Sequence, residues 1–326
     1  MFVNSVKSKV FLFINIVLFF IFSNKANAQK DTITIGAYIN SLYDFNLTDN
    51  SYKTEFWLWM KYNASNKIDT IQNQIEFINA KSSPHIQAAS TNRKGSINWY
   101  GAKYIGEFQK NWDVTSFPFD NQKLKITIES GEYSSDKIYF KPDTVNSKLN
   151  DFFKKNIKEW NIKDYKFYVT NSNYNTTFGD PELKMNSSYP SFNFEISIVR
   201  KDPYLALFKL ITGLLVAFII SCCVFFIKPI NVDPRFGLSV GGLFAAIGNK
   251  YIIEGKVPST NQITLLDNIH NLTFIYILLI TILSVISLHY YEIGSNSSKR
   301  KSQLIDRISF ISIFSSYFFF LYIIIY

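Results

Sequence analysis

Apolar and polar residues alternate in short runs before residue 200, and apolar residues form long unbroken segments after it. Lys53–Met60 (KTEFWLWM) and Lys123–Glu129 (KLKITIE) show the two-residue period of strands with one buried face. Clusters of Asn, Ser, Asp and Gly between such runs are typical of turns. The pattern therefore predicts an immunoglobulin-like all-β sandwich over residues 29–201 and a helical domain over residues 202–326.

The helical domain contains four segments that are long enough to cross a bilayer. A helix of about 20 residues spans about 30 Å, the thickness of the hydrocarbon core. Lys228 and Arg235 lie between the first two segments and Lys299–Lys301 between the last two, so both loops should be cytoplasmic and the sandwich outside the cytoplasm. We expect a four-helix transmembrane bundle with helices at residues 204–227, 235–253, 265–291 and 304–326.

The first 28 residues have the composition of a secretory signal peptide. Lys7 and Lys9 precede an apolar run from Val10 to Phe22, and Ala26-Asn27-Ala28 fits a cleavage site. A first transmembrane helix is the alternative, but the run is short for one. Removal of a signal peptide agrees with a sandwich that is exported.

The second transmembrane segment, Asp233–Glu254 (DPRFGLSVGGLFAAIGNKYIIE), is unusually polar and rich in glycine. Arg235, Ser239, Asn249 and Lys250 would be costly against hydrocarbon, so the helix should be shielded by protein or line water. It is either the pore helix of a homo-oligomeric channel or a small-residue packing helix in an inert bundle.

Composition and motifs exclude several other functions. Lys and Arg give a net charge of +9, but they are scattered or lie beside the apolar segments, so nucleic acid is not an expected partner. The cysteines, Cys222 and Cys223, are adjacent in an apolar run and cannot cross-link the sandwich. No phosphate loop, nucleophile elbow or metal-ligand spacing occurs, so we expect no enzyme, cofactor or metal.

Several stretches resemble one known family. Trp112–Ser130 (WDVTSFPFDNQKLKITIES) contains the motif FPFDNQ at Phe117–Gln122, which we call the signature loop. It resembles the loop at the membrane end of the sandwich in pentameric ligand-gated ion channels, the Cys-loop receptor superfamily. Thr54–Tyr62 resembles the second strand of that family, and Glu159–Ile162 a segment before the ninth. Animal members bracket the loop with two cysteines, which are absent here, as they are in bacterial members.

The resemblance assigns roles to the second transmembrane segment. Arg235–Leu238 resembles the cytoplasmic start of the family's pore helix, and Glu254–Pro258 its outer end. Five subunits would then surround a pore, in which Phe244 forms an apolar constriction. Periodicity alone gathers the polar residues on the opposite face, which amphipathic logic would turn to water; we follow the resemblance. The pore-lining residues that it implies are Gly237, Gly241, Phe244, Gly248 and Tyr251.

Charge selectivity should follow from charged residues at the two ends of this helix. Asp233 and Glu254 would form acidic rings, which favours cations. Arg235 lies close enough to Asp233 to neutralise it, or else it turns away from the axis. Asp233-Pro234 is also a typical helix start, and both readings can hold together.

The family binds its ligand between neighbouring sandwiches, in a pocket of aromatic rings that suits cationic or amphipathic ligands. Tyr133, Tyr174 and Phe178 are candidates on one subunit and Phe56 on its neighbour, although any of these rings could equally be core or surface filler. Coupling to the pore is implied for four residues at the domain junction, Asp120 and Arg200 as an ion pair together with Pro118 and Pro258.

The sequence thus favours a ligand-gated, cation-conducting homopentamer in the lipid bilayer of a bacterial inner membrane, with a small molecule or a proton as agonist. The alternative is a non-conducting membrane receptor or adaptor whose sandwich binds a ligand while its helices only associate. The polar second helix argues for the channel, because an inert anchor has no need of it.

Overall fold

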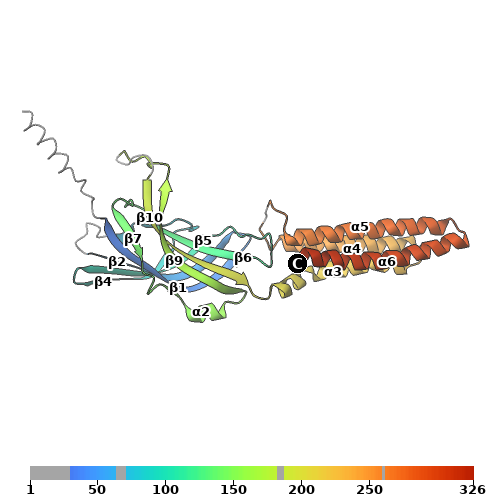
Figure 1. The fold of residues 1–326 in the computed structure, drawn as a ribbon, viewed down its shortest axis with the longest axis horizontal. Coiled ribbons are helices and arrows are strands. Elements are labelled where there is room, and N and C mark those ends of the chain that lie inside the picture. The colour runs from blue at the N-terminus through green and yellow to red at the C-terminus, as the bar shows by residue number, and fades with distance from the viewer. Residues whose placement is uncertain (1–29, 64–70, 182–186, 259–260) are drawn as a thin grey trace, which may run out of the picture.

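The computed structural model describes residues 30–63, 71–181, 187–258 and 261–326. They form two domains joined end to end, a β-sandwich followed by a bundle of four long helices (Figure 1). This architecture confirms the fold class expected from the sequence. The predicted signal peptide at residues 1–28 lies outside the described residues and stays a prediction.

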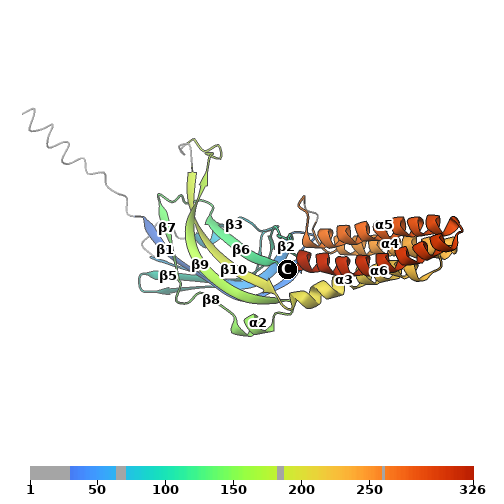
Figure 2. The ribbon, with the colours of Figure 1, turned by 45° about the vertical axis from the view of Figure 1, so that its right-hand side comes forward.

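The sandwich consists of a six-stranded and a four-stranded sheet. The first has the order β4-β5-β2-β1-β7, with β8 paired to β1, and comprises β1 (Asp31–Asn46), β2 (Ser51–Asn63), β4 (His85–Lys94), β5 (Ile97–Gln109), β7 (Ile138–Pro142) and β8 (Lys148–Leu149). The second has the order β3-β6-β10-β9 and comprises β3 (Ile75–Phe77), β6 (Asn121–Ser130), β9 (Trp160–Tyr174) and β10 (Ser187–Arg200). A short helix, α2 (Asp151–Asn156), precedes β9, and β10 leads directly into the bundle (Figure 2).

Strand β2 shows how alternation builds the core. Phe56, Leu58 and Met60 are fully buried, whereas Trp57 and Trp59 between them point to the other face and are half-buried. Burial of an apolar side chain of this size contributes about 1.5–3 kcal/mol relative to leaving it exposed. Strand β6 repeats the pattern with Leu124, Ile126 and Ile128, so the two sheets bury one continuous apolar layer.

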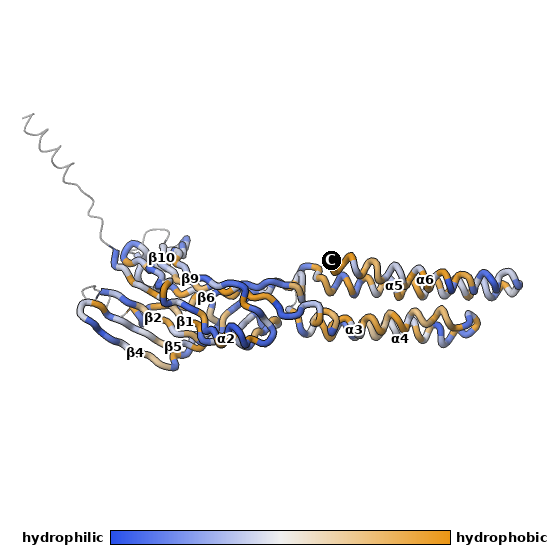
Figure 3. Tube along the Cα trace, turned by 60° about the horizontal axis from the view of Figure 1, so that its bottom comes forward, coloured by the Kyte–Doolittle hydropathy of each residue, from blue (hydrophilic) through white to orange (hydrophobic). Residues whose placement is uncertain are grey.

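The bundle comprises α3 (Pro203–Cys222), its 3₁₀ extension η2 (Cys223–Phe226), α4 (Val232–Glu254), α5 (Leu265–Glu292) and α6 (Asn296–Ile325). The four helices are long and apolar enough to cross a membrane (Figure 3). Helix α6 starts well before residue 304, where its apolar segment begins, because Ser295 caps the helix by accepting a hydrogen bond from the Ser298 amide at 3.1 Å. Hydropathy detects the apolar stretch of a helix and not its capped polar end.

Glycine allows close packing of α3 against α4. A Cβ atom at Gly242 would lie 2.0 Å from Ser221 Oγ and 2.9 Å from the Ala217 carbonyl oxygen. Ser221 itself donates a hydrogen bond to that carbonyl at 2.9 Å, which leaves no free volume there. A Cβ at Gly241, one residue earlier, would meet nothing within 4 Å. The two neighbouring glycines therefore serve different purposes.

We expect Gly242→Ala to lower the free energy of unfolding by about 1–3 kcal/mol, because the added methyl group overpacks the contact between α3 and α4. Gly241→Ala is the matched control, and it should be neutral or slightly stabilising since alanine favours helix. Denaturant unfolding in detergent, followed by helical circular dichroism, measures both. Equal losses for the two variants would contradict the close packing at Gly242.

Candidate functional site

Asp120 and Arg200 form a buried ion pair where the sandwich meets the bundle. Arg200 Nε lies 2.8 Å from Asp120 Oδ1, and both side chains are largely shielded from solvent. The guanidinium carbon of Arg200 lies 4.5 Å from the centre of the Phe117 ring and 4.2 Å from that of Trp160. Because ring faces attract cations, the two rings stabilise the charge of Arg200, the last residue of β10 before α3 begins. The structure thus brings together the pair that the sequence predicted.

The signature loop has further hydrogen bonds that fix its shape. Gln122 Nε2 donates to Asp120 Oδ2 at 2.7 Å and to the Asp113 carbonyl oxygen at 2.6 Å. Asp113 in turn accepts hydrogen bonds from the hydroxyl and the backbone amide of Thr115, which lower the pKa of its carboxyl group. The loop that carries Asp120 is therefore braced by hydrogen bonds to the residues just before it.

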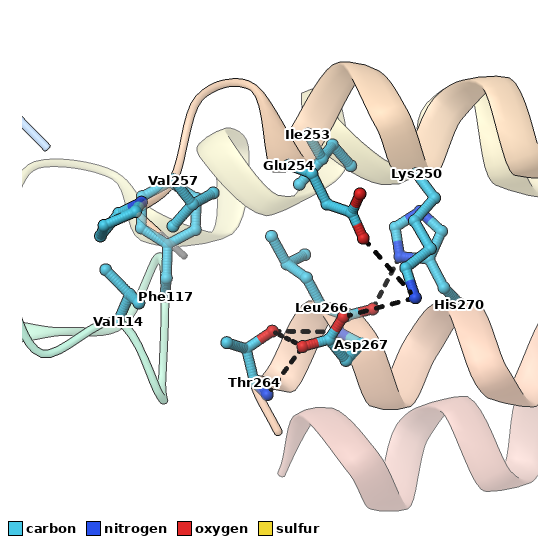
Figure 4. Close-up of a pocket in the computed structure, with 11 residues that line it drawn as sticks. Val114, Phe117, Lys250, Ile253, Glu254, Val257, Thr264, Leu266, Asp267 and His270 are labelled. Carbon is cyan, nitrogen blue, oxygen red and sulfur yellow. Dashed lines mark hydrogen bonds and ion pairs between the residues drawn. The ribbon is translucent and has the colours of Figure 1, made fainter. Parts of the chain in front are cut away.

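This braced segment contacts the bundle directly. The backbone amide of Leu265, at the start of α5, donates to the Thr115 carbonyl oxygen at 2.9 Å. Phe119 packs edge-on against Tyr204 of α3, with ring centres 4.9 Å apart. A cavity of about 300 Å³ lies between the two domains and is lined by Phe117 and Pro258, among others (Figure 4). Pro118 follows Phe117 in the loop, and Pro258 belongs to the connection from α4 to α5. The loop therefore contacts α3 and α5 and faces the end of α4 across this cavity.

The polar residues in the outer half of α4 have partners inside the bundle. Asn249 Nδ2 donates to the Leu210 carbonyl oxygen of α3 at 3.3 Å, and its Oδ1 lies 3.1 Å from His270 Nε2 of α5. Lys250 Nζ lies 3.7 Å from a Glu254 oxygen and 3.8 Å from an Asp267 oxygen (Figure 4). These contacts join α4 to both neighbouring helices.

The opposite face of α4 is uncovered in this chain. Phe244 and Tyr251 expose 67% and 71% of their surface. A Cβ atom at Gly237, Gly241 or Gly248 would meet nothing within 4 Å. All the predicted pore-lining residues thus share this exposed face, and the polar residues Arg235 and Ser239 lie on the buried one. The polar residues Arg235 and Ser239 are thus covered by the other helices of the bundle, whereas the amphipathic pattern would turn them to water.

The predicted selectivity residues fall into two groups. Asp233 and Glu254 are exposed near opposite ends of α4. Arg235 is only 1% exposed, and its Nη2 lies 2.5 Å from Asp306 Oδ2 on α6. Of the two alternatives for Arg235, the structure agrees with the second: the guanidinium does not pair with Asp233 but points into the bundle, where it contacts the carboxylate of Asp306.

Three of the four predicted ligand-binding rings lie at one end of the sandwich. Tyr174 and Phe178 pack edge-on with ring centres 5.3 Å apart. Tyr133 lies on the loop before β7, whose Ser135 amide donates to the Ser188 carbonyl oxygen of β10 at 2.7 Å, next to the strand pair that contains Tyr174. The sequence missed Tyr189, whose ring centre is 6.1 Å from that of Tyr174.

A buried carboxylate lies beneath this aromatic cluster. Glu129 is almost fully buried and accepts a hydrogen bond from Ser191 Oγ at 3.0 Å. Burial, and after it a hydrogen bond to Glu129, raises the pKa of the Tyr174 phenol. The cluster thus combines ring faces with a negative charge, a combination that suits a cationic group.

The expectation that Phe56 contacts a ligand is corrected, because its side chain is fully buried in the sandwich core and stacks on Tyr104. Strand alternation turns Trp57 and Trp59 to the outer face of β2 in its place. Trp59 Nε1 donates to Asp143 Oδ2 at 3.1 Å, and Lys61 Nζ lies 2.9 Å from the same oxygen. The alternation in FWLWM contained the signal that separates these two faces, because consecutive side chains on a strand point in opposite directions.

Comparison with known proteins found one similar to this chain. No family model matches the chain. The neuronal acetylcholine receptor subunit alpha-9 of Gallus gallus is 23% identical over 214 residues, which make up 62% of this chain and 39% of the relative. The chain thus spans about two fifths of the length of that protein. The similarity supports a place in the Cys-loop receptor superfamily, whose architecture of sandwich and four helices the chain shares.

We expect Asp120→Asn or Arg200→Gln to lower the free energy of unfolding by about 3–5 kcal/mol, because each leaves a buried charge without its partner. The double variant should lose less than the sum of the single losses, since it removes both charges. Asp44→Asn, which breaks the exposed pair with Lys53, is the matched control and should have little effect. Additive losses in this double-mutant cycle, measured by denaturant unfolding, would show that the pair is not coupled.

Proposed function

We propose that this chain is the subunit of a ligand-gated cation channel, in which five copies surround a central pore in a bacterial inner membrane with the sandwich outside the cytoplasm. The observation that carries the proposal is the exposed glycine and phenylalanine face of α4. A helix that turns Arg235, Ser239 and Asn249 inward, and whose glycine and phenylalanine face no other described helix covers, is suited to pack around an axis with copies of itself.

In such an assembly, Phe244 is the constriction. Its ring is the bulkiest side chain between Gly241 and Gly248, which bring only backbone to the same face. Five rings at one level form an apolar narrowing that stops ions by dewetting, without a physical plug. Widening of this ring by a small rotation or tilt of α4 opens the pore.

Selectivity comes from the acids that remain exposed. Asp233 lies at the start of α4 and Glu254 at its end, so the assembly has an acidic ring near each mouth. Rings of carboxylates attract cations and repel anions. Lys250 lies beside Glu254 but also interacts with Asp267, so its charge is shared between two carboxylates.

Ligand binding takes place at the aromatic cluster of Tyr133, Tyr174 and Phe178, closed by the outward-facing rings of β2 from the neighbouring subunit. A cationic or amphipathic ligand is favoured by the ring faces and by Glu129 beneath them. Strand β10 runs from this cluster to Arg200 and then into α3. Movement of the cluster would therefore reach the Asp120–Arg200 pair and, through the contacts of Thr115 and Phe119, the starts of α5 and α3.

Recording from purified protein in planar bilayers tests this proposal. Phe244→Ala should conduct without ligand, because five small side chains no longer exclude water from the constriction. Phe319→Ala on α6 is the matched control: this ring is similarly exposed, at 61%, but belongs to the outer surface of the bundle. A wild-type protein that passes no current under any condition would instead support a non-conducting receptor.

Asp233→Asn should lower the ratio of cation to anion permeability, since it removes one acidic ring at the cytoplasmic mouth. The reversal potential under a salt gradient measures this ratio. Asp151→Asn, which removes an acid of α2 on the sandwich, serves as the control and should leave the ratio unchanged. Equal ratios in the wild type and in Asp233→Asn would contradict a role for this ring.

A further inference from the structure

Arg235 is surrounded by acceptors from three separate elements of the bundle. Its Nε donates to the Ile227 carbonyl oxygen after η2 at 3.0 Å. Its Nη1 lies 3.3 Å from Ser284 Oγ on α5, and its Nη2 donates to Asp306 Oδ2 on α6 at 2.5 Å. Every nitrogen of the guanidinium thus has a partner, and Asp306 supplies the negative charge among them.

The position of Asp306 is fixed by a second set of contacts. Ser302 lies four residues earlier on α6, on the same face of the helix. Its hydroxyl donates to the Ser287 carbonyl oxygen of α5 at 2.8 Å and lies 2.9 Å from Ser287 Oγ. These bonds hold α6 against α5 one turn away from Asp306, so the carboxylate is presented to Arg235 by packed helices and not by a mobile loop.

Asp233 and Arg235 are two residues apart at the start of α4, and they point in different directions. Asp233 is exposed, whereas Arg235 is almost completely buried. A long cationic side chain that loses its buried partner moves its charge toward water when its stem can reach. At the first turn of α4, the exposed Asp233 lies two residues away, so a released Arg235 charge is expected to move toward the end of the helix where Asp233 lies.

We propose that Asp306 is a positioning residue for ion selectivity: by holding the charge of Arg235 inside the bundle, it leaves Asp233 unopposed at the cytoplasmic mouth. The inference rests on the proposed channel function and adds a determinant on α6, a helix that does not line the pore in that proposal. In this arrangement the outermost helix sets the charge at the mouth through a contact that is itself out of reach of the ions.

Four variants of the full chain in planar bilayers, compared by reversal potential under a salt gradient, test the inference. Asp306→Asn keeps the shape of the side chain but removes its charge, so the ratio of cation to anion permeability should fall severalfold toward unity. Adding Arg235→Gln to it should restore the wild-type ratio, because the released cation is then gone. Arg235→Gln alone should leave the ratio unchanged, and so should Arg307→Gln, a charge loss at the exposed neighbour of Asp306.

The outcomes separate this inference from the proposed function. A wild-type protein without current overturns both. Currents with the same permeability ratio in Asp306→Asn as in the wild type overturn the positioning role alone. Should Asp306→Asn fail to assemble, Arg235→Gln decides, because a ratio that rises in this variant would show that the charge of Arg235 already acts at the mouth.

Discussion

The requirement that polar groups find partners away from lipid governs the arrangement of the bundle. Helix α4 carries an arginine, a serine and an asparagine on one face, and each of them bonds within the bundle. Unpaired, these groups would cost several kcal/mol each in hydrocarbon. They therefore turn inward, and Gly242 lets α3 approach closely enough to enclose them. Between Asp233 and Glu254, the face left outside holds mainly glycine, alanine and large apolar side chains, so the same bonds that stabilise the bundle also determine which face of α4 stays exposed.

At the junction between the two domains, a buried charge is likewise paired within the protein. Arg200 is held between two aromatic rings and a carboxylate, at the point where β10 becomes α3. The carboxylate belongs to a loop that Gln122 braces from behind and that hydrogen-bonds to the start of α5. One ion pair thus joins the covalent link from β10 to α3 with the segment that hydrogen-bonds to the start of α5. The proposed coupling between the ligand site and the pore relies on this shared element.

Aromatic side chains have different surroundings in the core of the sandwich and at the far end of its second sheet. In the core of the sandwich, rings such as Phe56 fill space and contact one another. At the far end of the second sheet, Tyr174, Phe178 and Tyr189 gather over the buried carboxylate of Glu129, where a purely structural cluster would have no need of a charge. This contrast within one domain is the basis of the ligand site proposed at that end.

The sequence by itself determined the two-domain fold, since strand alternation and long apolar segments are local signals that need no partner to be visible. It also identified Asp120 with Arg200 and the glycine face of α4, through motifs rather than through periodicity. Only the tertiary structure decided that Arg235 points to Asp306, because the two residues lie on different helices far apart in the chain. It likewise decided that Phe56 belongs to the core and Trp57 to the surface, since which face of a strand is buried depends on the sheet packed against it.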